Sequence, residues 1–235
     1  MTLGRSVFPN NKTRFTDMKK LLMTVAVAAA AVAADAATTV TFSSPTWRDV
    51  GFGGGEFGAA LDGAPSPNFY TFCLEKNEAI QLGTPYGYTS GNAAVGGGIG
   101  GGSPDPISEG TAWLFTRFGQ GTLANYSFDV SSVAARLLRA AAAVRLQNAI
   151  WSLEDEQGPD LGNIFVAAVV AQFGSFAAAQ ADYAGNGVVV LNPAVASAGV
   201  QSVLRLATPV PDNGASLGLL GLGLAAIGVV RRIRS

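Results

Sequence analysis

The stretch VAARLLRAAAAVRLQNAIWSLEDEQG, residues 133–158, decides the fold, because it is a long and uninterrupted run of strong helix formers. Alanine, leucine and arginine all have high intrinsic helix propensity. Ser131 or Ser132 can cap the start of this run, and Gly158-Pro159 closes it. The sequence therefore predicts a helix within residues 130–157.

Gln147 is the polar residue of interest on this predicted helix. Val144 at i−3, Ile150 at i+3 and Trp151 at i+4 flank it on one face, so its side chain is predicted to point into the core. A buried amide is costly unless both of its ends are hydrogen-bonded. We therefore expect a specific partner for Gln147.

Extended segments surround the helical region on both sides. The segment TTVTF is predicted to form a first strand, the glycine-punctuated stretch 49–61 a hairpin region, and two late segments, GVVVLN and VQSVLRLA, are predicted to return as strands. Further helix is expected at residues 111–118 and 163–183. The predicted fold class is α+β: a mainly antiparallel sheet made from both ends of the domain, with a helical insert between them.

Composition excludes several classes of function. The chain has no histidine and a formal net charge of −1. The absence of histidine excludes serine and cysteine hydrolases that depend on a histidine base, and it removes the commonest metal ligand. The part between the two ends of the chain is acidic and carries no basic patch for nucleic acid. We expect neither an enzyme with catalytic residues nor a bound metal or cofactor.

Two local patterns were weighed as ligand sites. The run GGGIGGG, residues 96–102, lacks the Lys-Ser/Thr that a phosphate-binding loop needs, so a flexible loop is predicted. The carboxylates of Glu154, Asp155 and Glu156, with Asp160 nearby, point in different directions on a helix. We predict a solvated helix end there, with Ca²⁺ binding as the alternative.

Cys73 is the single cysteine, so it cannot form an internal disulfide bond. It is a buried inert thiol, an intermolecular partner or a reactive group. In NFYTFCLEKNE, Phe69, Thr71 and Cys73 alternate with Tyr70, Phe72 and Leu74, which predicts a strand over residues 68–74 that is mostly buried on both sides.

The two motifs YTFCLE and LQNAIW together resemble those of bacterial thioester domains, which are modules of surface adhesins. In that family a cysteine thiol and a glutamine side chain join into an internal thioester with loss of ammonia. The resemblance implies a cross-link between Cys73 and Gln147, surrounded by Phe72, Ile150 and Trp151. A thioester is a stored acyl electrophile that an amine can capture as a stable amide, and burial protects it from water. The glycine-rich loop at residues 96–102 is the candidate gate.

The alternative gives Cys73 and Gln147 a purely structural role. Cys73 is then a small buried hydrophobe, and Gln147 is hydrogen-bonded to a backbone group. The domain would be a structural component of an exopolysaccharide or biofilm layer. The state of Cys73 separates the two hypotheses.

The N-terminal residues are predicted to form an export signal. Met18-Lys19-Lys20 precedes the apolar run LLMTVAVAAAAVAA, and the small residues of ADAATT suit a signal peptidase. We predict a signal peptide over residues 1–36 with cleavage after Ala36, or after Ala33 as the second choice. The residues before Met18 are a long polar lead or follow a mis-called start, with the true start near residue 18. Residues 37–208 then form the exported domain.

The C-terminal segment, residues 209–235, is predicted to be a sorting signal with a membrane helix. No residue from Ala215 to Val230 is charged. A helix of that length spans roughly 24 Å, less than a bilayer core of about 30 Å. Arg231, Arg232 and Arg234 can reach the headgroups and mark the cytoplasmic end. A buried core helix is the alternative, although the many glycines and the lack of a polar stripe make it a poorer fit.

The motif before this helix consists of five residues: Val210, Pro211, Asp212, Asn213 and Gly214. Together with the apolar helix and the arginines, VPDNG resembles the PEP-CTERM class of sorting signals, and most closely the Val-Pro-Asp-Ser-Gly variant, with Asn213 in place of serine. The resemblance implies recognition by an exosortase at the inner membrane of a Gram-negative-type bacterium. Release to the cell surface or extracellular matrix would follow. The expected partners are the exosortase, signal peptidase, the membrane and an amine-bearing ligand, with no nucleic acid.

Overall fold

A computed structural model describes residues 39–45, 55–96, 98–195 and 198–207. The predicted signal peptide, membrane helix, sorting motif and terminal arginines all lie outside these residues. Among the described residues, no helix is long and apolar enough to cross a membrane.

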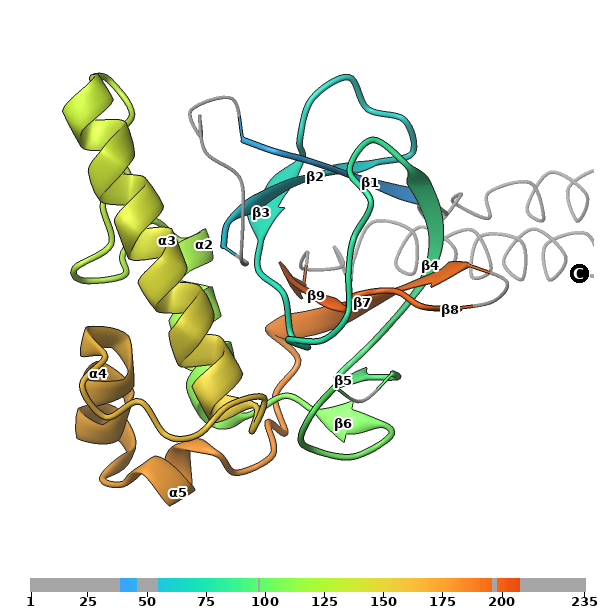
Figure 1. Ribbon diagram of the computed structural model, residues 1–235. Coiled ribbons are helices and arrows are strands. Elements are labelled where there is room, and N and C mark those ends of the chain that lie inside the picture. Colours follow the sequence, from blue (N-terminus) through green and yellow to red (C-terminus); the bar gives the residue numbers. More distant parts are fainter. Residues whose placement is uncertain (1–38, 46–54, 97, 196–197, 208–235) are drawn as a thin grey trace, which may run out of the picture. The chain divides into compact units, whose positions relative to one another are not determined.

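The described residues form an α+β fold, which confirms the predicted class (Figure 1). All strand pairs are antiparallel. The strands before the helices are β1 (Thr39–Ser43), β2 (Phe57–Leu61), β3 (Phe69–Thr71), β4 (Pro85–Gly91), β5 (Ala93–Ala94) and β6 (Asp105–Pro106). The strands after the helices are β7 (Val188–Val195), β8 (Ala198–Gly199) and β9 (Val203–Leu206).

The main sheet has seven strands in the order β3-β2-β1-β4-β7-β8, with β9 also paired to β7. Strands from both ends of the domain meet where β4 pairs with β7, as the sequence predicted. Strand β4 itself was missed, because its sequence PYGYTSG offers only the alternation of two tyrosines among proline, glycine and small polar residues, which is a weak strand signal. The short pair β5–β6 forms a separate sheet.

Four helices lie between these two groups of strands, among the described residues: α2 (Glu109–Gly119), α3 (Val133–Leu153), α4 (Ile164–Phe173) and α5 (Phe176–Ala179). Ser132 caps α3 by accepting a hydrogen bond from the Ala135 N–H at 3.1 Å. The helix ends four residues earlier than the predicted limit, at Leu153. The single helix predicted at 163–183 is divided into α4 and α5, because Gly174 takes a left-handed conformation and Ser175 caps a new helix.

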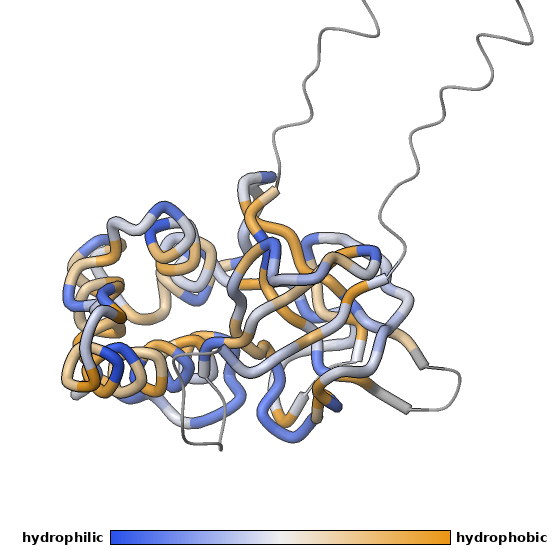
Figure 2. Tube along the Cα trace, turned by 90° about the horizontal axis from the view of Figure 1, so that it is seen from above, coloured by the Kyte–Doolittle hydropathy of each residue, from blue (hydrophilic) through white to orange (hydrophobic). Residues whose placement is uncertain are grey.

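Hydrophobic residues form two clusters, one on each face of the sheet. The larger cluster lies between helices and sheet and includes Phe72, Phe115, Leu146, Ile150 and Leu204. The smaller cluster includes Val40, Phe42, Leu191 and Val203. Figure 2 shows the helices on one side and the strands on the other, with stretches of hydrophobic residues in both. The helix α3 is thereby held against the core, and polar groups on its inner face are removed from water.

Candidate functional site

Cys73 lies where the sheet closes on itself. Up to Thr71 the chain pairs with β2, and after it the chain crosses to β9, where Cys73 forms an antiparallel bridge with Val203. The hydrogen bonds at this bridge are made by the residues on either side of Cys73 and Val203. Leu204 N–H donates to Phe72 O at 3.4 Å, and Leu74 N–H donates to Ser202 O at 3.0 Å. The N–H and C=O of Cys73 therefore face away from β9. The predicted strand over 68–74 thus changes its partner halfway along its length.

The side chain of Gln147 binds both of these main-chain groups. Its Nε2 donates to Cys73 O at 2.8 Å, and its Oε1 accepts from Cys73 N–H at 3.0 Å. Oε1 also accepts from Gly55 N–H at 3.2 Å. The register that pairs Phe57 with Thr71 places Gly55 opposite Cys73, so the amide fills the gap between two diverging strands. Gly55 has a φ of 127°, a conformation that favours glycine.

The structure thus brings together the two residues that the sequence singled out. Gln147 is fully buried and Cys73 is 6% exposed. The position of Gln147 on its helix predicted the burial and the need for a partner, but Val144, expected to flank it inside the core, is 40% exposed. The partner that the structure supplies is the main chain of Cys73. Formation of a thioester by the two side chains stays a prediction.

Three further polar groups lie next to this site, and the sequence reasoning missed all of them. Glu56 is fully buried and forms an ion pair with Arg139, whose Nε donates to Glu56 Oε2 at 3.0 Å. Tyr126 donates its hydroxyl to the same oxygen at 2.5 Å. The Nη1 atom of Arg139 also donates to Phe128 O at 2.8 Å. The signals available in the sequence were a lone glutamate in the apolar stretch GFGGGEFGAAL and an arginine two turns before Gln147.

Burial shapes the titration of this cluster. Burial, followed by the charge of Glu56, raises the pKa of Tyr126 far above its usual range. The tyrosine therefore stays a hydrogen-bond donor at all physiological pH values. Burial alone would lower the pKa of Arg139, but its hydrogen bond to Glu56 and the charge of that residue raise it. The guanidinium is therefore always charged.

The three residues predicted to surround the thioester are all buried. Phe72 and Ile150 are fully buried, and Trp151 is 7% exposed. Phe72 packs edge-on against Phe118 with ring centroids 5.0 Å apart. The indole N–H of Trp151 has no hydrogen-bond partner among the described residues, and the Lys76 ammonium lies 5.6 Å from the centroid of its ring. The three side chains that the resemblance places around the thioester are therefore all removed from water.

The prediction of a solvated acidic helix end was wrong. Glu154 is 7% exposed and Glu156 is 2% exposed, because α3 ends at Leu153 and the turn that follows directs both carboxylates inward. Glu154 accepts from Ser108 N–H at 3.1 Å and from Ser108 Oγ at 2.7 Å. Asp155 alone of the three stays exposed. No cluster of carboxylate, cysteine or histidine side chains in the described part of the chain is arranged to hold a metal ion.

Glu156 fastens the glycine-rich loop that the sequence suggested as a gate. Its Oε2 accepts from Lys76 N–H at 2.6 Å and from Ile99 N–H at 3.1 Å, while its Oε1 accepts from Gly100 N–H at 3.2 Å. A side chain at Gly98 would collide with this carboxylate. The glycines thus permit a close approach of the loop to Glu156. The Glu156 carboxylate in turn links the loop to Lys76, in the segment that follows Cys73.

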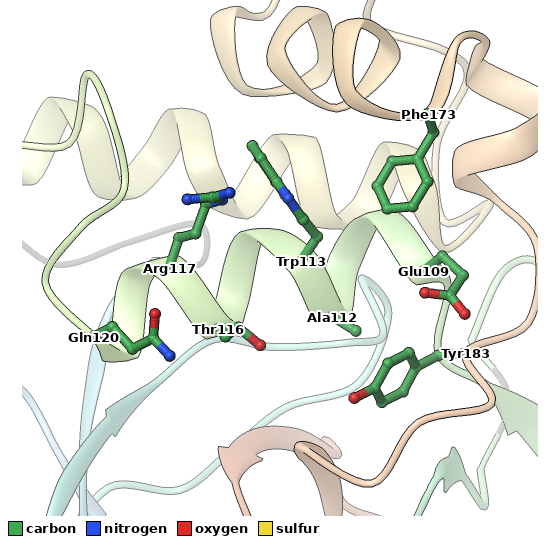
Figure 3. A pocket seen from close by; sticks show the side chains of 8 residues that line it. All are labelled: Glu109, Ala112, Trp113, Thr116, Arg117, Gln120, Phe173 and Tyr183. Atoms are coloured by element: carbon green, nitrogen blue, oxygen red, sulfur yellow. The ribbon is translucent and has the colours of Figure 1, made fainter.

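Two surface hollows in the described part of the chain involve α2, and neither is lined by Cys73 or Gln147. The first, of about 280 Å³, lies along α2 between Trp113, Phe173 and Tyr183, with Glu109 and Arg117 at its edge (Figure 3). The second, of about 600 Å³, has aromatic walls and includes Arg139 and Arg205. Neither of these two hollows therefore gives access to Cys73 and Gln147, which are buried.

Comparison with known proteins gives one match. Residues 209–234 match a family described as the VPDSG-CTERM motif. The chain therefore carries a C-terminal sorting signal of this type, with Asn213 at the serine position. Such a signal implies processing by an exosortase and export to the cell surface or extracellular space. No curated protein and no solved structure matches the chain.

Proposed function

We propose that this exported protein attaches covalently to amine-bearing partners at the cell surface or in the extracellular matrix, through an internal thioester between Cys73 and Gln147. One observation carries the proposal: the amide of Gln147 is inserted from the middle of α3 against the main chain of Cys73, with hydrogen bonds of 2.8 and 3.0 Å. The two residues come from segments 74 positions apart in the sequence. Their meeting in a closed site suits a bond that must be kept from water.

The chemistry requires only groups that the chain and its partner supply. Cys73 Sγ attacks the Cδ atom of Gln147, the Cδ–Nε2 bond breaks, and Nε2 leaves as ammonia with the thiol proton. A primary amine of the partner then attacks the same carbon. The Cδ–Sγ bond breaks, the sulfur regains a proton from the amine, and a stable amide remains. Each molecule reacts once, so the protein is a covalent adhesive and not an enzyme.

The termini deliver the domain to its place of action. We propose that signal peptidase removes residues 1–36 and that the apolar segment within residues 209–235 holds the chain in the inner membrane until an exosortase acts near Val210–Gly214. The match of residues 209–234 to a sorting motif supports this route. The Gram-negative setting is part of the proposal.

The second candidate is a sorted structural protein of an exopolysaccharide or biofilm layer in which no thioester forms. The observation that favours it is that three hydrogen bonds already satisfy the buried amide of Gln147. In this case the amide replaces a missing neighbouring strand, and Cys73 packs as a small apolar side chain.

Intact mass spectrometry distinguishes the two functions. Wild-type protein and Cys73→Ala are purified after export and compared with and without methylamine, so that any processing of the termini cancels between them. For the thioester we expect wild-type protein one ammonia lighter than its sequence mass, a gain of one methylamine on treatment, and neither change in Cys73→Ala. Wild-type protein at its sequence mass, with a thiol that reacts after unfolding, would leave the structural function.

A further inference from the structure

We propose that Glu56, held by Arg139 and Tyr126, is a positioning residue that keeps the Gly55 N–H on the Gln147 carbonyl oxygen, where Gly55 and Cys73 form a two-donor oxyanion hole. The inference rests on the proposed function and adds to it the groups that control how fast the thioester forms and reacts. Neither Gly55 nor the Glu56 cluster is part of the thioester motifs.

The hydrogen bonds to Gln147 Oε1 have the geometry that acyl transfer needs. Attack on Gln147 Cδ, by Cys73 Sγ or by a primary amine, moves negative charge onto Oε1. The donors from Cys73 and Gly55 stand 3.0 and 3.2 Å from that atom. Two fixed main-chain N–H groups in a buried site stabilise such a charge without reorganisation. When ammonia or the thiolate leaves, the carbonyl reforms between the same donors.

The two donors are not equally secure. The N–H of Cys73 is fixed because its neighbours are both hydrogen-bonded, Phe72 to Leu204 in β9 and Leu74 to Ser202 just before β9. Gly55 instead precedes β2 by two residues and has a positive φ, so the sheet does not hold it. The next residue, Glu56, is therefore the anchor that determines where the Gly55 N–H points.

The anchor connects the donor to the same helix that carries the acceptor. Arg139 and Gln147 both project from α3, and Arg139 binds the Glu56 carboxylate through Nε and Nη2. Tyr126 adds a third hydrogen bond to that carboxylate from outside the helix. Movement of α3 would carry Gly55 and Gln147 together, which preserves the hydrogen bond between them. A contribution to the stability of the fold is a poor explanation for the Glu56–Arg139 ion pair, because a buried ion pair usually adds little stability compared with apolar side chains of similar volume.

The first test removes the ion pair and keeps its packing. The double variant Glu56→Leu/Arg139→Met should unfold at a slightly lower denaturant concentration than wild-type protein, because apolar side chains replace the ion pair but the Tyr126 hydroxyl and Phe128 O each lose a partner. Methylamine capture should slow by about 100-fold, as expected for loss of an oxyanion donor. Hydrogen exchange at the Gly55 amide should accelerate in the same variant. A double variant that folds, captures methylamine at the wild-type rate and keeps the Gly55 amide protected overturns the positioning role.

A second pair of variants keeps the test decisive if the double variant fails to fold. Tyr126→Phe removes one hydrogen bond to Glu56. The control, Tyr86→Phe, removes the hydroxyl of a buried tyrosine in the smaller core cluster, where that hydroxyl accepts from Gln81 N–H. We expect capture to slow about fivefold in Tyr126→Phe, as for partial displacement of one donor, and to be unchanged in Tyr86→Phe. Equal capture rates in both variants overturn the inference.

The wild-type mass separates this inference from the proposed function. If wild-type protein shows no loss of ammonia, both the function and the inference fail. If wild-type protein forms the thioester and captures methylamine, but Tyr126→Phe does so at the wild-type rate, only the positioning role fails.

Discussion

The middle of α3 and its C-terminal end both bury polar side chains against distant backbone, but they do so with different charges. In the middle, a neutral amide binds Gly55 and Cys73, and the one carboxylate, Glu56, is paired with a guanidinium. At the end, Glu154 and Glu156 are carboxylates that meet N–H and hydroxyl groups. The comparison shows that the negative charge in the middle is paired with a guanidinium, whereas Glu154 at the end carries a charge that burial disfavours.

Glu154 shows the consequence most clearly. Burial raises the pKa of Glu154 from 4.5 to about 7, although hydrogen bonds from Ser108 act in the opposite direction, and the charge of Asp105 adds to the increase. Burial likewise raises the pKa values of Glu78 and Asp105, to which Glu156 adds repulsion in both cases. Negative charge therefore accumulates at the C-terminal end of α3, where no ion pair among the described residues joins these carboxylates to a cation.

The largest effect is expected in the middle of the helix. Gln147→Leu leaves the N–H and C=O of Cys73 and the N–H of Gly55 without partners in a buried site, which should lower the free energy of unfolding by about 4 kcal/mol. Urea denaturation measures the change. The matched control is Gln157→Leu, at the partly exposed end of the same segment, where we expect a loss of less than about 1 kcal/mol. Equal losses in the two variants would remove the distinction between the regions.

The second prediction concerns pH at the end of the helix. Because the folded-state pKa of Glu154 lies above its unfolded value, stability is fully present below pH 4.5 and is lost as the pH rises through about 7. Glu154→Gln should remove this loss and raise the free energy of unfolding by about 2 kcal/mol at pH 8, but by little at pH 4.5. Denaturation curves at several pH values measure it. A gain that is independent of pH would contradict the assignment.

The third prediction concerns the hydrogen bond that caps the start of the same helix. Ser132→Ala removes the side-chain acceptor of the Ala135 N–H and should cost about 1 kcal/mol. Ser131→Ala is the control, because Ser131 precedes the cap, and its loss should stay below about 0.5 kcal/mol. Thermal unfolding of the two variants gives the difference. The larger loss in Ser131→Ala would show that the helix begins elsewhere.

The smallest effect is expected at Lys76, an exposed residue beside the end of α3. Its ammonium contacts the ring of Trp151 and binds Gln157 Oε1 at 3.0 Å. Lys76→Met should cost about 0.5 kcal/mol because solvent screens the contacts of an exposed cation. Denaturation in low and high salt measures it. A loss near that of Gln147→Leu would mean that the end of the helix is as important to the fold as its middle.

Much of the helical part was predictable because helix propensity and capping act over a few neighbouring residues. Residues 133–153 contain strong helix formers after Ser132, and α3 forms there. The break between α4 and α5 was not predicted, because a glycine within an apolar run marks a helix end only when the chain turns there. Strand β4 escaped notice because its partners β1 and β7, and not its own sequence, make it extended.

The candidate site was predictable only in part. The two motifs indicated Cys73 and Gln147, and the periodicity around Gln147 predicted its burial. Gly55, Glu56 and Tyr126 were not found, because nothing in their own neighbourhoods shows that they meet α3. The error at Glu154 and Glu156 has the same origin: carboxylates are assumed to face water unless a fold provides donors for them.

The sequence by itself determined the α+β class, the long central helix with its inward glutamine, and the C-terminal sorting signal, because these depend on local propensity, periodicity or a short motif. Only the tertiary structure decided that the sheet closes at Cys73, that Gly55 stands opposite it, and that Gln147 fills the gap between them. These contacts join residues 74 and 92 positions apart. The burial of the whole core selects such pairings, and no local pattern of residues encodes them.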